Sequence, residues 1–486
     1  MASHGDSSGP SQALYARRVK VFPKAVSGAF RRLKWGVMAV TLAIYYFTPW
    51  LRWDRGPYAP DQAVLVDLAN RRFYFFAIEI WPHEFYYVAG LLVMAGIGLF
   101  LLTATVGRAW CGYACPQTVW TDLFLHIERA IDGDRNAQIR LQNAPWGPVK
   151  IAKRIFKHGT WLIVALLTGG AWVFYFADAP TLARDLISGN AAFVAYATIG
   201  VLTVTTYVLG GLMREQVCIY MCPWPRIQGA MLDEKSLIVT YKQWRGEPRT
   251  HGIKKAAETG EKMGDCIDCN ACVAVCPTGI DIRNGPQLAC ITCALCIDAC
   301  DDVMAKVGRP RGLIDYATYE GCKAEAAGKA PVSVLRTVFR SRTLLYFGLW
   351  AAIGLAMAFS LGGRSRLDLS VAQDRNPIWV RMSDGDIRNG YTIKIRNMEA
   401  RPRDVELLLA DAPGALMWDS LASEESATKA LRLTLPPDQV EKHRIYVRAP
   451  GEGPAKSEIR LTVRALDARK AEDSDEVRFD RPEAGQ

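Results

Sequence analysis

Eight of the thirteen cysteines lie within one stretch of 35 residues, in two near-copies of one pattern. The first copy contains Cys266, Cys269, Cys272 and Cys276, and the second contains Cys290, Cys293, Cys296 and Cys300. Runs of this spacing bind two 4Fe-4S clusters, and the fourth cysteine of each run binds the cluster of the other run. The spacing therefore predicts one cluster on Cys266, Cys269, Cys272 and Cys300, and a second on Cys290, Cys293, Cys296 and Cys276.

Zinc sites and disulfides are the alternatives for these eight cysteines. Structural zinc usually takes two pairs of ligands, whereas each run here has three closely spaced cysteines and a fourth. The doubled run favours iron–sulfur chemistry, in which the chain transfers single electrons at low potential. The sequence has no Gly-rich dinucleotide fingerprint between a strand and a helix, so we do not expect it to take hydride from a nicotinamide.

A second cysteine pattern occurs twice outside these runs. Cys111 and Cys115 precede Pro116, Cys218 and Cys222 precede Pro223, and both motifs read CXXXCP with a tyrosine at the same place. A spacing of four places two thiols on one face of a helical turn, and the proline favours a helix break there. Four thiols could bind Cu(I) or an iron–sulfur cluster, cycle through a disulfide, or serve as small apolar residues.

The elements that position these cysteines are apolar. Half of the residues are hydrophobic, and they gather in five runs long enough to cross a bilayer: 35–51, 85–106, 161–177, 191–213 and 343–361. Aromatic residues such as Trp35, Trp50 and Trp161 lie at the ends of these runs, as membrane interfaces favour. Each CXXXCP motif follows the second run of a two-run hairpin, which indicates an internal repeat.

Basic residues predict the orientation of the spans. The segment before the first run carries seven cationic residues, among them Arg17 and Arg18, and the loop after the second run carries eight. Positive loops stay in the cytoplasm. We therefore expect a bacterial inner-membrane protein with a cytoplasmic N-terminus and cysteine-run segment and a periplasmic C-terminal segment. The net charge of +10 is then a topology signal, and no basic stripe with interleaved aromatics indicates a nucleic-acid partner.

The segment 364–486 has no cysteine and alternates apolar and polar residues in several short runs, such as 391–396, 405–409, 430–435 and 459–463. This period indicates antiparallel strands, and we expect a small β-sandwich of immunoglobulin type. The predicted division is a cytoplasmic N-terminal segment (1–34), a four-span membrane core with both CXXXCP motifs (35–231), a cytoplasmic ferredoxin-like α+β domain with two 4Fe-4S clusters (232–342), a fifth span (343–363) and the periplasmic sandwich (364–486).

Two CXXXCP motifs after membrane hairpins, a two-cluster ferredoxin run, a last span and a sandwich domain resemble the CcoG/FixG/RdxA family. The stretches 73–76 and 122–135 are similar to that family too. The resemblance implies an accessory protein for the maturation of cbb(3)-type cytochrome c oxidase, an oxidoreductase that reduces Cu(II) to Cu(I). The resemblance also implies that the catalytic or copper-binding residues are Cys111, Cys115, Cys218 and Cys222. The expected partners are the membrane, copper, oxidase subunits or copper chaperones and transporters, and an unidentified electron donor. Cys322 has no place in the pattern.

Two other functions stay open at this point. The first is a quinol-oxidising component similar to the NapH proteins, in which the membrane core oxidises quinol and the clusters pass electrons onward. The second is a non-enzymatic scaffold for oxidase assembly, in which the clusters are structural. Copper reduction requires both sets of cysteines, whereas a scaffold would tolerate the loss of a cluster ligand.

Overall fold

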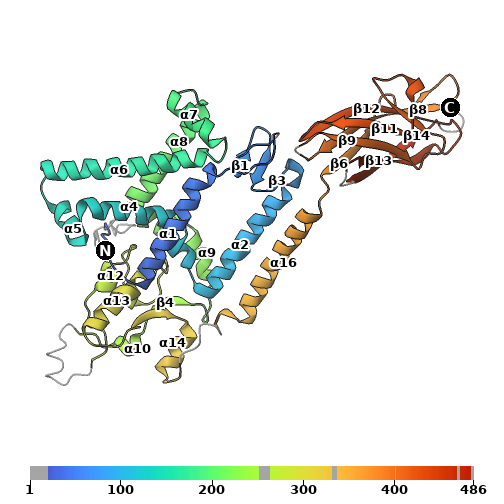
Figure 1. Ribbon diagram of the computed structural model, residues 1–486. Helices are drawn as coiled ribbons and strands as arrows, with labels where there is room; N and C mark the ends of the chain where they lie inside the picture. The colour runs from blue at the N-terminus through green and yellow to red at the C-terminus, as the bar shows by residue number, and fades with distance from the viewer. Residues whose placement is uncertain are drawn as a thin grey trace, which may run out of the picture. The chain divides into compact units, whose positions relative to one another are not determined.

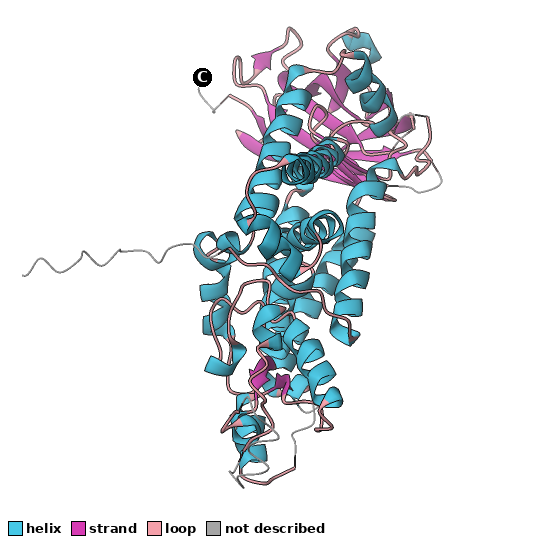
Figure 2. Ribbon diagram, turned by 90° about the vertical axis from the view of Figure 1, so that its left-hand side faces the viewer, coloured by secondary structure: helices cyan, strands magenta, loops and turns pink. Residues whose placement is uncertain are grey.

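The computed structural model describes residues 20–57, 59–250, 263–330, 337–399, 401–467 and 471–482. Arg17 and Arg18, on which part of the predicted orientation depends, lie outside these residues. The chain divides into two compact units, 1–51 with 64–74 and 79–354, and 52–63 with 75–78 and 355–486. Helices make up most of the first unit, and most of the strands belong to the C-terminal segment (Figures 1 and 2).

Helices dominate the part of the chain that precedes the cysteine runs. Their bounds are α1 Ala29–Phe47, η1 Thr48–Trp50, η2 Pro82–Glu84, α2 Tyr86–Val106, α3 Ala109–Tyr113, α4 Pro116–Asp132, α5 Arg135–Asn143, α6 Pro148–Val173, α7 Ala179–Ser188, α8 Phe193–Thr206, η3 Tyr207–Met213, η4 Val217–Met221 and α9 Trp224–Met231. The segments η3 and η4 are π-helical, a conformation that is rare and frequent at functional sites.

Among the described residues, three helices are long and apolar enough to cross a membrane: Pro82–Val106, Phe193–Met213 and Ser341–Gly363, the last being α16. They coincide with three of the five predicted spans. The predicted span 35–51 falls largely on α1, which carries Arg31, Arg32 and Lys34 in its N-terminal half. The predicted span 161–177 falls largely on α6, which carries Lys153, Arg154 and Lys157 in its N-terminal half. The count of five spans therefore stays a prediction.

Buried ion pairs join α1, α4, α6 and the end of η3. Arg31 of α1 contacts Asp122 of α4 at 2.9 Å. Lys157 of α6 contacts Glu128 at 3.0 Å and Asp132 at 2.8 Å. Arg214, after η3, contacts Glu128 at 2.6 Å. Figure 1 shows α4 and α6 side by side. Because a buried charge without its partner costs about 3–5 kcal/mol, these pairs fix how the helices are placed.

The cysteine runs belong to a small α+β segment. Its elements are β4 Ile238–Tyr241, α10 Gln243–Gly246, α12 Ala271–Ala274, η5 Ile282–Asn284, α13 Leu295–Lys306, β5 Ile314–Ala317 and α14 Tyr319–Ala326, with β4 and β5 antiparallel. Ile297 and Met304 of α13 are buried with Leu313 and Ile314. Asp298 of α13 accepts a 2.8 Å hydrogen bond from the backbone N–H of Arg31, which holds the first turn of α1 on this segment.

The loop between the first two predicted spans contains structure that its sequence did not predict. Three short strands, β1 Val64–Asp67, β2 Arg72–Phe75 and β3 Ile78–Ile80, form one sheet in that order. Strands of three or four residues give too few alternations for a period to be recognised.

The C-terminal segment forms two sheets. One has the order β10-β12-β8-β6, with β7 also paired to β8, and the other has the order β11-β9-β13-β14. The bounds are β6 Leu367–Gln373, β7 Val380–Arg381, β8 Ile387–Asn397, β9 Arg403–Ala410, β10 Leu416–Asp419, η6 Glu424–Ser426, β11 Ala430–Leu435, β12 Gln439–Ala449, β13 Lys456–Ala465 and β14 Glu472–Asp480. All four alternating runs that predicted strands lie in strands of these sheets.

Both sheets contribute to one core. Tyr391, Ile393 and Ile395 of β8 and Val405 and Leu407 of β9 are fully buried, because alternate side chains of each strand point to the same face. The carboxylates of Asp473 and Asp475 on β14 accept backbone hydrogen bonds from β6. These bonds occupy N–H groups of a strand that ends its sheet, which reduces its tendency to pair with another chain.

Candidate iron–sulfur and membrane-thiol sites

The two cysteine runs fold into equivalent turns. In the first run Asp268 and Asn270 have positive φ, at 52° and 56°, and in the second run Thr292 and Ala294 take the same places with 56° and 61°. Positive φ is uncommon for residues with a side chain, and for a β-branched threonine it is an outlier. Where a residue in the left-handed conformation adjoins one in the right-handed conformation, successive backbone N–H groups point into the same concavity. This geometry is found at many Fe–S sites.

A cavity in this segment is lined by cysteines. Its wall includes Cys272, Cys276, Cys290, Cys293 and Cys296, and the remaining lining residues are mostly apolar, among them Ile280, Ile282, Ile291 and Leu295. Thiolates in a dry, apolar setting are the donors of a 4Fe-4S cluster. The residues present therefore fit such a cluster.

The thiols form two groups that influence one another electrostatically. Burial raises the pKa of Cys300, with smaller increases from the charges of Cys272, Cys269 and Cys266. Burial also raises the pKa of Cys296, with smaller increases from Cys293, Cys290 and Cys276. This grouping supports the ligand sets expected from the spacing, although the assignment itself stays a prediction. Among the described residues, no three His, Cys, Asp or Glu side chains surround a single metal ion. A cluster does not require that, because each cysteine binds a separate iron.

A basic residue that the sequence did not single out lies beside the first group of thiols. The guanidinium of Arg283 pairs with Asp281 at 2.7 Å, donates to Asn270 at 2.6 Å and also contacts Asp268. Burial raises the pKa of Cys272 to about 11, and the charge of Arg283 opposes that increase. Arg283 thus fixes the first cysteine turn and contributes positive charge beside the thiolates.

The two CXXXCP motifs share a local structure. Cys111 lies in α3 and Cys218 in the π-helical η4. Cys115 and Cys222 end these turns in extended conformations, with ψ of 128° and 122°. The extended backbone follows from the prolines at 116 and 223, because a proline disfavours the helical conformation of the residue before it. Each proline is followed by a helix, so the thiol turn and the helix break are present at both motifs, and the two-span hairpins before them stay a prediction.

The four CXXXCP thiols are close enough for their charges to act on one another, but in the structure as described no three of them surround a single metal ion. Burial, together with the charges of Cys115, Cys218 and Cys222, raises the pKa of Cys111 to about 12, and the charge of Arg108 opposes the increase. Cys111 Sγ donates a 3.2 Å hydrogen bond to Gln228 Oε1. Cys222 is exposed, whereas the other three are partly buried. Because burial disfavours thiolates, a soft cation bound among them would replace the hydration that they lack.

The first CXXXCP turn packs directly on the second cysteine run. A Cβ at Gly112 would lie 2.7 Å from the carbonyl oxygen of Ile291 and 3.0 Å from the Cα of Cys293. Tyr113 OH donates to the carbonyl oxygen of Cys293 at 3.2 Å. Cys111 also packs on the apolar group that contains Ile291 and Cys293. Only glycine permits this close approach of the two backbones.

Arg108 connects three parts of the site. Its guanidinium donates to the carbonyl oxygens of Cys290, at 3.0 Å, and of Leu288 and Pro225. It thereby holds together the turn before Cys111, the start of the second cysteine run and the segment after Pro223. Sequence reasoning missed Arg108 and Gly112, although both lie within four residues of Cys111, because their partners are more than 100 residues away.

Cys322 lies apart from both sites. It is buried in α14, and burial raises the pKa of its thiol. The charged groups that influence it are Glu325, Lys242 and Asp315, with no other cysteine among them. Its position agrees with a packing role.

Three regions of the chain match known protein families. Residues 213–319 match a 4Fe-4S dicluster domain, residues 88–132 match a 4Fe-4S binding domain, and residues 357–482 match the Ig-like fold at the C-terminus of FixG. The second match covers Cys111 and Cys115, and the first covers Cys218, Cys222 and both cysteine runs. The matched regions and the cysteine sites define an iron–sulfur electron-transfer protein.

The chain is 58% identical over 461 residues to nitrogen fixation protein FixG of Rhizobium meliloti, covering 90% of this chain and 88% of the relative. It is 54% identical to RdxB and to RdxA of Cereibacter sphaeroides, covering 94% of this chain and 95% and 96% of those proteins. A FixG-related protein from Vibrio parahaemolyticus aligns at 17% identity over 24% of this chain and 98% of that structure, with a TM-score of 0.20. The chain belongs to the FixG/RdxA family.

Proposed function

We propose that this protein reduces Cu(II) to Cu(I) at the four CXXXCP thiols, for the maturation of a cbb(3)-type cytochrome c oxidase. One observation carries the proposal: the first CXXXCP turn packs on the second cysteine run, where Tyr113 OH donates to the carbonyl oxygen of Cys293 and Cys111 packs on the buried group that contains Cys293. A soft-metal site thus adjoins a predicted source of single electrons.

The residues that would hold the clusters are the eight cysteines of the two runs, in the sets Cys266, Cys269, Cys272 and Cys300, and Cys290, Cys293, Cys296 and Cys276. When bound, such clusters supply single electrons at low potential. The reduction of Cu(II) to Cu(I) takes one electron. Arg108 and Gly112 act as positioning residues, because they keep the second run against the CXXXCP turn.

The CXXXCP thiols bind copper, the substrate, through soft sulfur donors that favour Cu(I) over harder ions. Cys222 is exposed and receives the ion, whereas the partly buried Cys111 and Cys218 limit the access of water. The reaction adds one electron to Cu(II), and the Cu(I) formed remains on thiolates until an acceptor takes it. Oxidase subunits or copper chaperones and transporters are the proposed acceptors.

The experiment that tests this function uses anaerobically purified full-length protein with its clusters reduced by dithionite and the excess dithionite removed. Cu(II) is added with a Cu(I)-specific chelator that reports the ion by its absorbance. We expect Cu(I) to form in the wild-type protein and not in a Cys115→Ser, Cys222→Ser variant that retains its iron. Equal yields from both proteins would overturn the proposal.

Quinol oxidation is a second candidate, because a cavity lies between helices next to the first CXXXCP motif. It has a volume of about 200 Å³ and is lined by Tyr45, Gln117, Trp120, Thr168 and other residues, including Pro116, which follows Cys115. An aromatic wall with a few polar groups suits a ring-shaped ligand. This function predicts that a soluble quinol reduces the clusters without copper, and that Trp120→Ala slows the reaction.

A further inference from the structure

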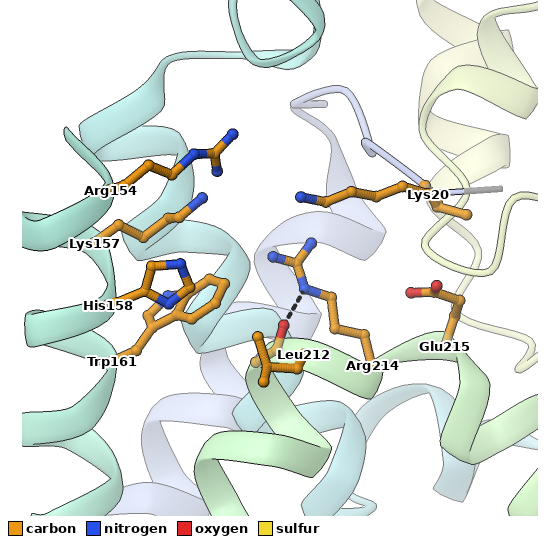
Figure 3. Close-up of a pocket in the computed structure, with 10 residues that line it drawn as sticks. Lys20, Arg154, Lys157, His158, Trp161, Leu212, Arg214 and Glu215 are labelled. Atoms are coloured by element: carbon orange, nitrogen blue, oxygen red, sulfur yellow. Dashed lines mark hydrogen bonds between the residues drawn. The ribbon is translucent and has the colours of Figure 1, made fainter. Parts of the chain in front are cut away.

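A basic pocket that the proposed function does not use lies at one end of the apolar helix Phe193–Met213. Its volume is about 350 Å³, and the wall includes Lys20, Arg154, Lys157, His158 and Arg214. Figure 3 shows Lys20 reaching in from the segment before α1, opposite Arg154 and Lys157 of α6, with Arg214 between them. Four cationic side chains from three parts of the chain thus surround one opening.

Three of these cations already have carboxylate partners. Lys157 contacts Glu128 and Asp132, and Arg214 contacts Glu128. Arg154 lies 3.7 Å from Asp132. Glu215 also lines the pocket. Against four cations, these three carboxylates leave one positive charge uncompensated.

That charge falls on Lys20. In the described part of the chain, its ammonium has no hydrogen bond or salt bridge and lies 5.0 Å from the ring centroid of Phe22. Burial lowers the pKa of Lys20 to about 8, opposed by Glu128, while Lys157, Arg214 and Arg154 repel its charge. Lys20 is exposed as a whole, but its ammonium faces three other cations without a partner of its own among the described residues, and an anion bound among them would offset their mutual repulsion.

The location of the pocket narrows the choice of anion. Gly211 and Leu212, at the end of the candidate span, line it together with Trp161. Span ends lie at the level of lipid headgroups, and basic pockets between membrane helices on the cytoplasmic side bind anionic headgroups. We propose that this pocket binds a phosphate-type anion, supplied by the headgroup of an anionic phospholipid.

Lipid binding to the full-length protein in neutral detergent tests the proposal by native mass spectrometry. The probes are phosphatidylglycerol and phosphatidylcholine with the same acyl chains. We expect phosphatidylglycerol to bind at least about tenfold more tightly, and Lys20→Gln to remove about tenfold of that affinity, as expected for a lost hydrogen bond to a charged group. Arg154→Gln is a second variant that should act in the same direction.

The matched control is Lys153→Gln, which removes the same charge from the neighbouring position of α6 outside the pocket. Iron content confirms that each variant is folded. Equal binding of the two lipids, or equal effects of Lys20→Gln and Lys153→Gln, would overturn the proposal. Calorimetry with inorganic phosphate distinguishes a lipid headgroup from free phosphate as the source of the anion. If phosphate binding depends on Lys20 but the protein shows no preference between the two lipids, the pocket is an anion site and the proposal that a phospholipid supplies the anion is overturned.

Discussion

The guanidinium of Arg108 donates a 3.0 Å hydrogen bond to the carbonyl oxygen of Cys290. It also contacts the carbonyl oxygens of Leu288 and Pro225. One buried side chain therefore connects the first CXXXCP motif, the second cysteine run and the segment that follows the second CXXXCP motif. The proposed copper site and the predicted electron source are held together by this residue.

Arg108→Lys should weaken that connection. An ammonium group cannot reproduce the planar fork that reaches three carbonyl groups, and unsatisfied buried acceptors cost about 1–3 kcal/mol. We expect a lower midpoint of thermal unfolding and faster loss of iron from the purified protein. Arg226→Lys, at an exposed position near Pro225, is the control and should behave like the wild type. Identical iron retention in the two variants would refute a positioning role for Arg108.

Gly112→Ala should separate the CXXXCP turn from the second cysteine run. The added methyl group would lie 2.7 Å from a backbone carbonyl oxygen, that of Ile291, which cannot rotate away as a side chain would. Overpacking of this kind costs about 1–3 kcal/mol, and denaturant unfolding measures it. At Gly36 in α1 the same substitution meets no atom within 4 Å and should be neutral. If Gly112→Ala is equally neutral, the close contact is absent in solution.

Chemical analysis of anaerobic protein should give about eight irons and eight sulfides per chain, because each 4Fe-4S cluster contains four of each. Cys293→Ser should remove mainly one cluster, leaving about four irons. A wild-type value near four, or zinc in place of iron, is incompatible with the predicted ligand sets.

Reporter fusions distinguish five spans from three. With five spans, fusions after Asp178 and after Arg366 report the periplasm, and fusions after Lys150 and Lys306 report the cytoplasm. If only the three candidate helices cross the membrane, the fusions after Lys150 and Asp178 report the same side. That result would remove α1 and α6 from the spans.

The sequence predicted the features whose signals are local. The cysteine spacing predicted the iron–sulfur region that the family match over residues 213–319 confirms, and the alternation in 391–396 and 430–435 predicted strands that the structure contains. The prolines at 116 and 223 predicted the helix breaks. Each of these depends on neighbouring residues only.

The features that could not be predicted from the sequence depend on contacts between segments that are far apart along the chain. Gly112 has the role of a contact point only because Ile291, about 180 residues later, lies against it. The π-helical turn that carries Cys218 has no marker of its own, since its sequence also suits an α-helix. Lys20 acquires its surroundings only when α6 and the residues after η3 are placed beside it.

The reoxidation of reduced clusters by buffered Cu(II) tests the central claim most directly. The absorbance of dithionite-reduced protein, freed of excess dithionite, is followed after rapid mixing with a limiting amount of glycine-bound Cu(II). If the four thiols form the copper site beside the clusters, the wild type reoxidises with Cu(I) retained on the protein. Cys115→Ser, Cys222→Ser protein with full iron content then reacts at least about tenfold more slowly and retains none. Equal rates and equal Cu(I) retention in the two proteins would contradict the account.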